Sequence, residues 1–90
     1  MSAELPGHIT VGLQWPRSQA RVLRALAERV ARRELPGVDP ELFDKAATAT
    51  ELGEPLHVVA TDRAEVGAMA ALFATLGTST PAVVDVRVPE

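Results

Sequence analysis

The stretch from residue 56 to residue 88 constrains the fold more than any other part of the chain. It reads as a strand over 56–61, a helix over 62–76 and a second strand over 82–88. The helix is apolar almost all round, because Val, Gly, Ala, Met, Leu and Phe make up nearly all of its last three turns. A helix that is apolar on every side is typical of a buried position, so we expect this one to be buried.

The rest of the composition indicates one small domain with a thin core. Domains usually have roughly 100–150 residues, so 90 residues suffice for only one. We predict a flexible arm over 1–7 and a single α+β domain over 8–90. The only aromatic residues are Trp15, Phe43 and Phe73. The core must therefore consist mainly of Val, Leu and Ala, and this shortage of bulky side chains favours a partner that buries further apolar surface.

Several classes of protein are excluded by what the sequence lacks. It has no cysteine, which excludes disulfides, thiol catalysis and cysteine-bound metals. Its first residues do not resemble a signal peptide. Its longest apolar run, 66–74, is about half of the roughly 20 residues that a membrane span needs. No phosphate-binding glycine motif occurs. We therefore expect a cytoplasmic protein without membrane contact or cofactor.

The first half of the chain predicts a strand followed by an amphipathic helix. Apolar and polar residues alternate from His8 to Trp15, which indicates a strand with one buried face in an open-faced sheet. Ser18 is a suitable cap for the next helix. Apolar residues then recur every three or four positions over 22–31, with arginines around the rest, which predicts a helix of about 17 residues.

The middle of the chain leaves one assignment open. Asp39 and Pro40 predict the start of another helix, and Asp62 with Glu65 predicts a capping box. Residues 48–52 either extend the second helix or form a strand. We favour the strand, which makes the fold a ferredoxin-like, split βαβ two-layer sandwich with a mostly antiparallel sheet and helices on one face. Without it, the sheet has three strands.

One candidate site lies on the polar face of the predicted sheet. His57 and Asp85 open onto this face from two strands and could be neighbours there, so they could hold a ligand or move a proton. Trp15 and Gln14 could complete a pocket for a small ligand or substrate. The alternatives are a surface histidine and a tryptophan that closes one end of the core. No metal-ligand spacing occurs and no hydroxyl has a base beside it, so we predict no metal site and no catalytic residue.

A second candidate site depends on the uneven distribution of charge. Residues 1–33 carry six arginines and two glutamates, a net charge of +4, and residues 34–90 carry −7. This asymmetry suits head-to-tail contact or an acidic partner, although a solvated helix face explains it as well. Candidate residues for an anion or an acidic partner are Arg17, Ser18, Arg21, Arg24 and Arg32.

Nucleic acid is a weaker alternative for the arginine-rich helix. The net charge of the whole chain is −3, whereas nucleic-acid-binding domains are usually basic. The predicted sheet also lacks the exposed aromatic residues on which RNA bases stack.

The sequence thus favours a non-catalytic protein-interaction module. We expect it to form homo-oligomers, first of all a homodimer, through its open sheet face, with Gly12, Val59 and Val83 at the contact. We further expect its arginine-rich helix to bind another protein. The alternatives are a ligand-binding domain or small enzyme with its pocket near Trp15 and His57, and weak binding of nucleic acid.

Overall fold

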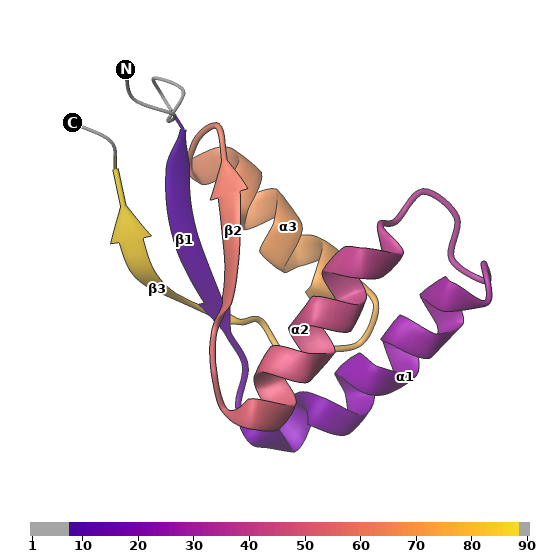
Figure 1. Ribbon diagram of the computed structural model, residues 1–90. Coiled ribbons are helices and arrows are strands. Elements are labelled where there is room, and N and C mark those ends of the chain that lie inside the picture. The colour runs from indigo at the N-terminus through magenta and orange to yellow at the C-terminus, as the bar shows by residue number, and fades with distance from the viewer. Residues whose placement is uncertain (1–7, 89–90) are drawn as a thin grey trace.

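The computed structural model of the chain describes residues 8–88, so the predicted arm over 1–7 lies outside the described residues. Over residues 8–88 the order of elements is β1 (Ile9–Gln14), a short 3₁₀ turn (Arg17–Gln19), α1 (Ala20–Ala31), α2 (Pro40–Leu52), β2 (Leu56–Ala60), α3 (Arg63–Thr75) and β3 (Ala82–Arg87). The strands form one sheet in the order β2-β1-β3. Both outer strands run antiparallel to β1 (Figure 1).

The predicted α+β class with an antiparallel sheet is confirmed, but the preferred strand over 48–52 is wrong. These residues complete α2, which buries Ala47 and Thr50 at helical spacing. The helix ends because Gly53 adopts the left-handed conformation, with φ 74°. The described chain therefore has the three-stranded alternative rather than a four-stranded ferredoxin-like sheet. It keeps the arrangement in which β2 and β3 flank β1 and are joined by α3.

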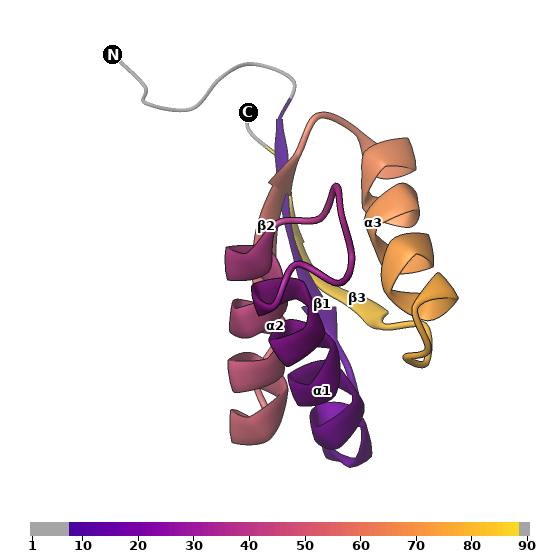
Figure 2. The same cartoon turned by 90° about the vertical axis from the view of Figure 1, so that its right-hand side faces the viewer.

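The helices leave one face of the sheet uncovered. Figure 1 and Figure 2 together show α3 behind the sheet and the hairpin of α1 and α2 beside β2. On β1 the side chains of Ile9, Val11 and Leu13 are buried toward the helices, as the alternation predicted. Neither view shows a helix over the opposite face, here called the open face. Strands β2 and β3 form the two edges of the sheet, with β3 on the side away from α1 and α2.

The core is centred on a cluster of the three aromatic side chains. The ring of Phe73 stacks on Phe43 with centroids 4.6 Å apart and meets the edge of Trp15 at 4.8 Å. These contacts join α3 to α2 and to the end of β1. The indole N–H of Trp15 donates to the carbonyl oxygen of Ser79 at 3.0 Å, which anchors the loop after α3. The surrounding core is aliphatic, as the composition predicted.

Helix α3 is buried on one side only, so the expectation of a fully buried helix is wrong. Val66, Ala70 and Phe73 face the core. The opposite side is solvent-exposed and consists of small or aliphatic residues, here called the outer face of α3: Ala64, Gly67, Ala68, Ala71 and Leu72. The helix stands at the surface because no further element of residues 8–88 packs behind it.

A β-bulge in β3 changes which of its side chains share a face. Thr10 pairs with Arg87 and Gly12 with Val84, so β3 has one extra residue in this interval. Asp85 takes the positive φ of 52° that the bulge requires, a conformation in which Asp is better tolerated than most residues. Strict alternation placed Val83 and Asp85 on the same face. Instead, the pairing of Val83 with Leu13 places Val83 on the helix side of the sheet, and the bulge brings Val86 to the same side.

The predicted caps are confirmed for two helices and wrong for one. The carboxylate of Asp39 accepts a hydrogen bond from the backbone N–H of Glu41, and that of Asp62 accepts one from Glu65. Glu65 in turn accepts a hydrogen bond from the backbone N–H of Thr61. A regular capping box would use the N–H of Asp62, one residue later. Ser18 caps nothing, because it lies inside the 3₁₀ turn that precedes α1.

The aromatic cluster predicts a large difference between neighbouring positions of α3. Phe73→Ala should lower the free energy of unfolding by about 3–5 kcal/mol, because the vacated volume lies between three elements. Leu72→Ala, at the preceding position on the outer face, should cost about 1 kcal/mol or less. Urea denaturation followed by circular dichroism measures both. Equal losses would contradict the one-sided burial of α3.

Candidate interaction surface

The open face of the sheet brings together the predicted pair of His57 and Asp85. The Nε2 atom of His57 lies 3.6 Å from a carboxylate oxygen of Asp85, and both side chains are about half exposed. They meet across Gly12, which pairs with His57 on one side and with Val84 on the other. The expectation that the two are neighbours is confirmed. An exposed pair at this distance contributes little binding or stability by itself.

The four residues of the predicted ligand pocket do not converge. Trp15 is 2% exposed and directs its indole N–H to the loop after α3, so it closes the core as the alternative reading stated. Gln14 points to the turn after α2, where its side-chain amide donates to the carbonyl oxygen of Gly53 at 3.4 Å. Only His57 and Asp85 remain together on the open face. Among residues 8–88 no group of three potential metal ligands occurs.

Most of the candidate arginines are engaged within the chain. Arg24 donates two hydrogen bonds to the carboxylate of Glu51, at 2.8 and 3.0 Å, and another to Asp44 at 2.8 Å. Arg17 donates to the carbonyl oxygen of Glu51 at 3.1 Å. The bonds of Arg24 hold α1 against α2, and because Glu51 and Asp44 accept them they raise the pKa of Arg24 above its already high value.

The other members of the arginine set are not assembled into a site. Arg32 pairs with Glu34 at 2.6 Å. Arg21 and Ser18 are exposed, but they are not joined to the rest by any ion pair or hydrogen bond among the described residues. Arg24 and Arg32 are already paired with carboxylates, so Arg17 and Arg21 are the candidate arginines that keep a charge without a carboxylate partner among the described residues, which is little for nucleic acid or an acidic partner.

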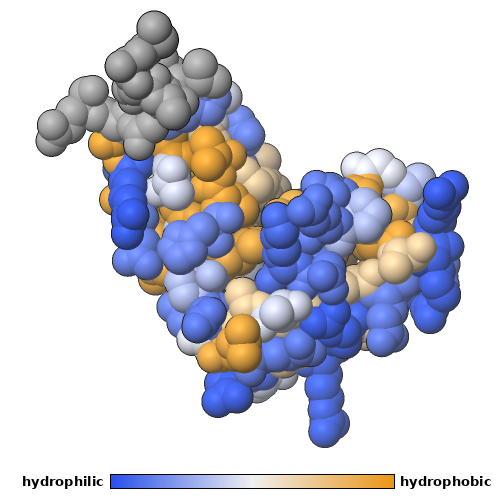
Figure 3. All heavy atoms as spheres, viewed as in Figure 1, coloured by the Kyte–Doolittle hydropathy of each residue, from blue (hydrophilic) through white to orange (hydrophobic). Residues whose placement is uncertain are grey.

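The three residues expected at a self-association contact lie in three different environments. Val59 is on the open face and 61% exposed. Gly12 is buried on that face, because Val84 and Pro55 cover it so closely that an added Cβ would lie 2.9 Å from the Val84 side chain. Val83 is on the helix side of the sheet, because it pairs with Leu13, whose side chain is buried there. The expected contact over the open face is therefore not a continuous apolar surface, and Figure 3 shows hydrophobic and hydrophilic groups interspersed there.

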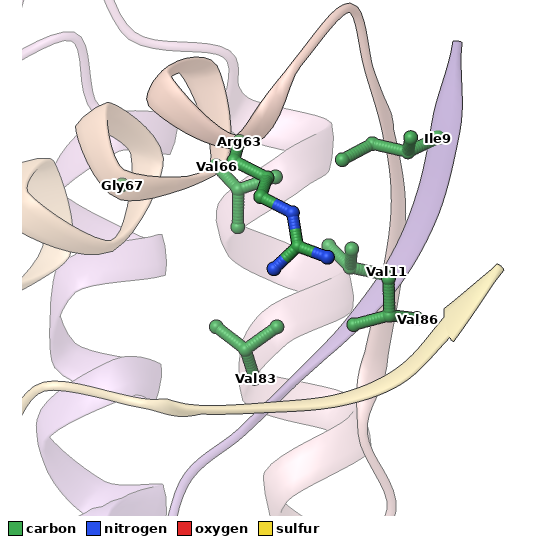
Figure 4. Close-up of a pocket in the computed structure, with 7 residues that line it drawn as sticks. All are labelled: Ile9, Val11, Arg63, Val66, Gly67, Val83 and Val86. Atoms are coloured by element: carbon green, nitrogen blue, oxygen red, sulfur yellow. The ribbon is translucent and has the colours of Figure 1, made fainter. Parts of the chain in front are cut away.

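A groove between α3 and β3 was not predicted from the sequence. This groove, here called the α3–β3 groove, has a volume of about 220 Å³. Its lining is mainly aliphatic and consists of Ile9, Val11, Arg63, Val66, Gly67, Val83 and Val86. Figure 4 shows the guanidinium group of Arg63 reaching into it between the valines of the sheet and α3. The alternating pattern of β3 concealed this groove, since only the bulge brings Val83 and Val86 to the same side.

The groove continues onto the outer face of α3. Gly67 belongs to both surfaces, and Ala68, Ala71 and Leu72 follow along the helix. Val83 and Val86 are 50% and 42% exposed although they face the helix side of the sheet. The side of the molecule formed by α3 and β3 is therefore an apolar surface without a covering layer, which is typical of a site of interaction.

No family model, curated protein or solved structure matches this chain. Over the described residues no helix combines the length and the apolar character required to cross a membrane.

The bond between Arg24 and Glu51 predicts an acid-dependent stability. The hydrogen bonds from Arg24 lower the pKa of Glu51 below 4.5, so the stabilisation is complete above that pH and is lost as the pH falls through the lowered pKa. In Arg24→Gln the pKa of Glu51 should return toward 4.5, because the charged donor is gone.

Glu34 provides an internal control for this titration. Its pKa is lowered by Arg32 and should stay low in Arg24→Gln. Carboxyl titration of both glutamates by NMR measures the two values in the same sample. A pKa of Glu51 that is the same in the variant and in the parent protein would show that Arg24 does not hold α2 in this way.

Proposed function

We propose that this protein is a small non-catalytic interaction module that associates with copies of itself through the α3–β3 groove and the adjoining outer face of α3, here together called the α3–β3 surface. The observation that carries the proposal is the exposure of Val83 and Val86 on the side of the sheet that normally lies under a helix. In a two-layer α+β domain such side chains belong to the core. A second chain that covers them would remove this apolar surface from water.

The outer face of α3 supports the same reading. Its exposed residues have few atoms, which lets the backbone of another chain approach closely. A specific interface usually buries roughly 800 Å² on each partner. The groove alone is too small for that, so the contact has to extend along Ala68, Ala71 and Leu72. Both surfaces lie on one side of the molecule and share Gly67.

The open face supports association less well than the sequence suggested. Its centre is occupied by the pair of His57 and Asp85 and by the covered Gly12. Val59 and Val84 are the aliphatic side chains that its strands offer beyond alanine among the described residues, and Val84 is partly buried with Pro55 over Gly12. Covering this face would remove the charges of the pair from water for little apolar gain. We therefore move the proposed contact from the open face to the α3–β3 surface.

Two further expectations remain part of this proposal. One is a cytoplasmic location, which the absence of cysteine favours. The other is kinship with the ferredoxin-like plan, which the placing of β1 between β2 and β3 favours, with α2 extended where the plan has its additional strand.

An aspartate in the groove should prevent association. Val83→Asp and Val86→Asp each place a charge in the proposed apolar contact, and each should raise the dissociation constant of the oligomer at least about tenfold. The matched control is Val59→Asp, which makes the same change at a similarly exposed valine on the open face. It should leave association unchanged.

Sedimentation velocity over a concentration series measures all three variants and the parent protein. A parent protein that stays monomeric at the highest concentration would overturn the proposal. So would association that is weakened by Val59→Asp but not by the two groove variants, because the contact would then be on the open face.

A further inference from the structure

The α3–β3 groove combines aliphatic walls with a single charged group. Its volume of about 220 Å³ is below the roughly 300–1,000 Å³ of sites for drug-sized ligands. It is therefore suited to a few side chains of another protein rather than to a cofactor. The groove is open to solvent at Gly67, since nothing lies within 4 Å of the place where a Cβ would be. The guanidinium group of Arg63 projects over this space (Figure 4).

Arg63 is a donor without a carboxylate. Arg24, Arg29 and Arg32 each form an ion pair with an acid of this chain, whereas Arg63 forms none among residues 8–88. A guanidinium group makes its strongest hydrogen bonds with a carboxylate, and such bonds strengthen when apolar side chains exclude water around them. The occupant that fits this groove therefore presents an aliphatic side chain with a carboxylate close beside it.

The turn after α2 presents this combination. Leu52 is 64% exposed, the highest value among the large apolar residues of the described chain. Glu54 is exposed two residues further on and pairs with no basic group among residues 8–88. Gly53 lies between them in the left-handed conformation that ends α2. An exposed leucine and a free carboxylate are thus held on one short turn, here called the Leu52–Glu54 turn.

The Leu52–Glu54 turn is held in position both by α2 and by residues outside it. The backbone N–H of Glu54 donates to the carbonyl oxygen of Ala49 at 2.8 Å. Arg17 donates to the carbonyl oxygen of Glu51, and Gln14 to that of Gly53. These bonds account for two polar residues that the sequence pointed to as ligand contacts. A turn that is ordered before binding loses less conformational entropy when it docks.

The turn and the groove cannot meet within one copy. Strand β2 begins just after the turn and leads to the start of α3, so Glu54 and Arg63 lie beyond opposite ends of a strand about 17 Å long (Figure 1). A contact between them has to join different copies.

We infer that the α3–β3 groove of one copy binds the Leu52–Glu54 turn of a second copy, with Leu52 against the valines and Glu54 on Arg63. The inference rests on the proposed self-association and specifies which surfaces meet. The contact joins two different surfaces, so it is head-to-tail, and each copy keeps a free turn or a free groove for the next one.

Trans-complementation of two variants tests the inference. Leu52→Asp removes the turn's apolar group and keeps the groove, whereas Arg63→Glu keeps the turn and reverses the charge of the groove. Each alone should raise the dissociation constant at least about tenfold, because it loses the burial of a leucine or the ion pair. An equimolar mixture should form a 1:1 dimer, since one intact turn and one intact groove remain. Sedimentation velocity on each variant and on the mixture gives the masses.

A charge exchange provides the second variant. Glu54→Arg alone should weaken association, and the double variant Arg63→Glu with Glu54→Arg should restore it. Both positions are exposed, so the fold should be kept, which circular dichroism checks. Restoration in the mixture and in the double variant would support the inference.

The outcomes separate this inference from the proposal on which it rests. If Val86→Asp prevents association while Leu52→Asp and Glu54→Arg leave it unchanged, the groove binds something else and the inference is overturned, but the proposed function stands. If the mixture stays monomeric although both variants are folded, the inference is likewise overturned. If Val86→Asp has no effect, or the parent protein is monomeric, both fail.

Discussion

The contact of Phe73 with Trp15 and Phe43 is the interaction on which the rest of the structure depends. Through this contact α3 packs against both the end of β1 and α2. It also decides the rotation of α3, because Val66 and Ala70 lie on the same side as Phe73 at helical spacing. The opposite side of α3 is thereby directed to solvent, whatever its composition.

The exposed apolar surface follows from this rotation together with the bulge in β3. Helix α3 contacts β1 and β2 and leaves β3 without cover. The extra residue at Asp85 then brings Val83 and Val86 to the uncovered part of the helix side. A strand without a bulge would have alternated its valines between the two faces. The groove is thus a product of one irregular residue and of the position of one helix.

The charged residues divide between those that form ion pairs within the chain and those that form none among residues 8–88, and of the latter Arg63 lines the α3–β3 groove. Arg24 connects α1 to Asp44 and Glu51 of α2, so the arginine-rich helix is part of a clamp within the chain. Arg17 and Gln14 hold the backbone of the turn after α2. Arg63 is the basic group that the groove presents without a carboxylate partner among the described residues. We propose a head-to-tail contact because this unpaired guanidinium group can bind the free carboxylate of Glu54 in another copy.

The sequence by itself determined the local structure: the half-buried β1, the amphipathic α1, the caps at Asp39 and Asp62, and the apolar content of α3. These features depend on periodicity and on hydrogen bonds between near neighbours, which a sequence displays directly. Only the tertiary structure decided that 48–52 continues a helix, that α3 buries a single side, and that Val83 and Val86 share a groove with Arg63. The reason is that each of these depends on which surfaces are left over when distant elements pack, and residues far apart in the chain have no common pattern that reveals it.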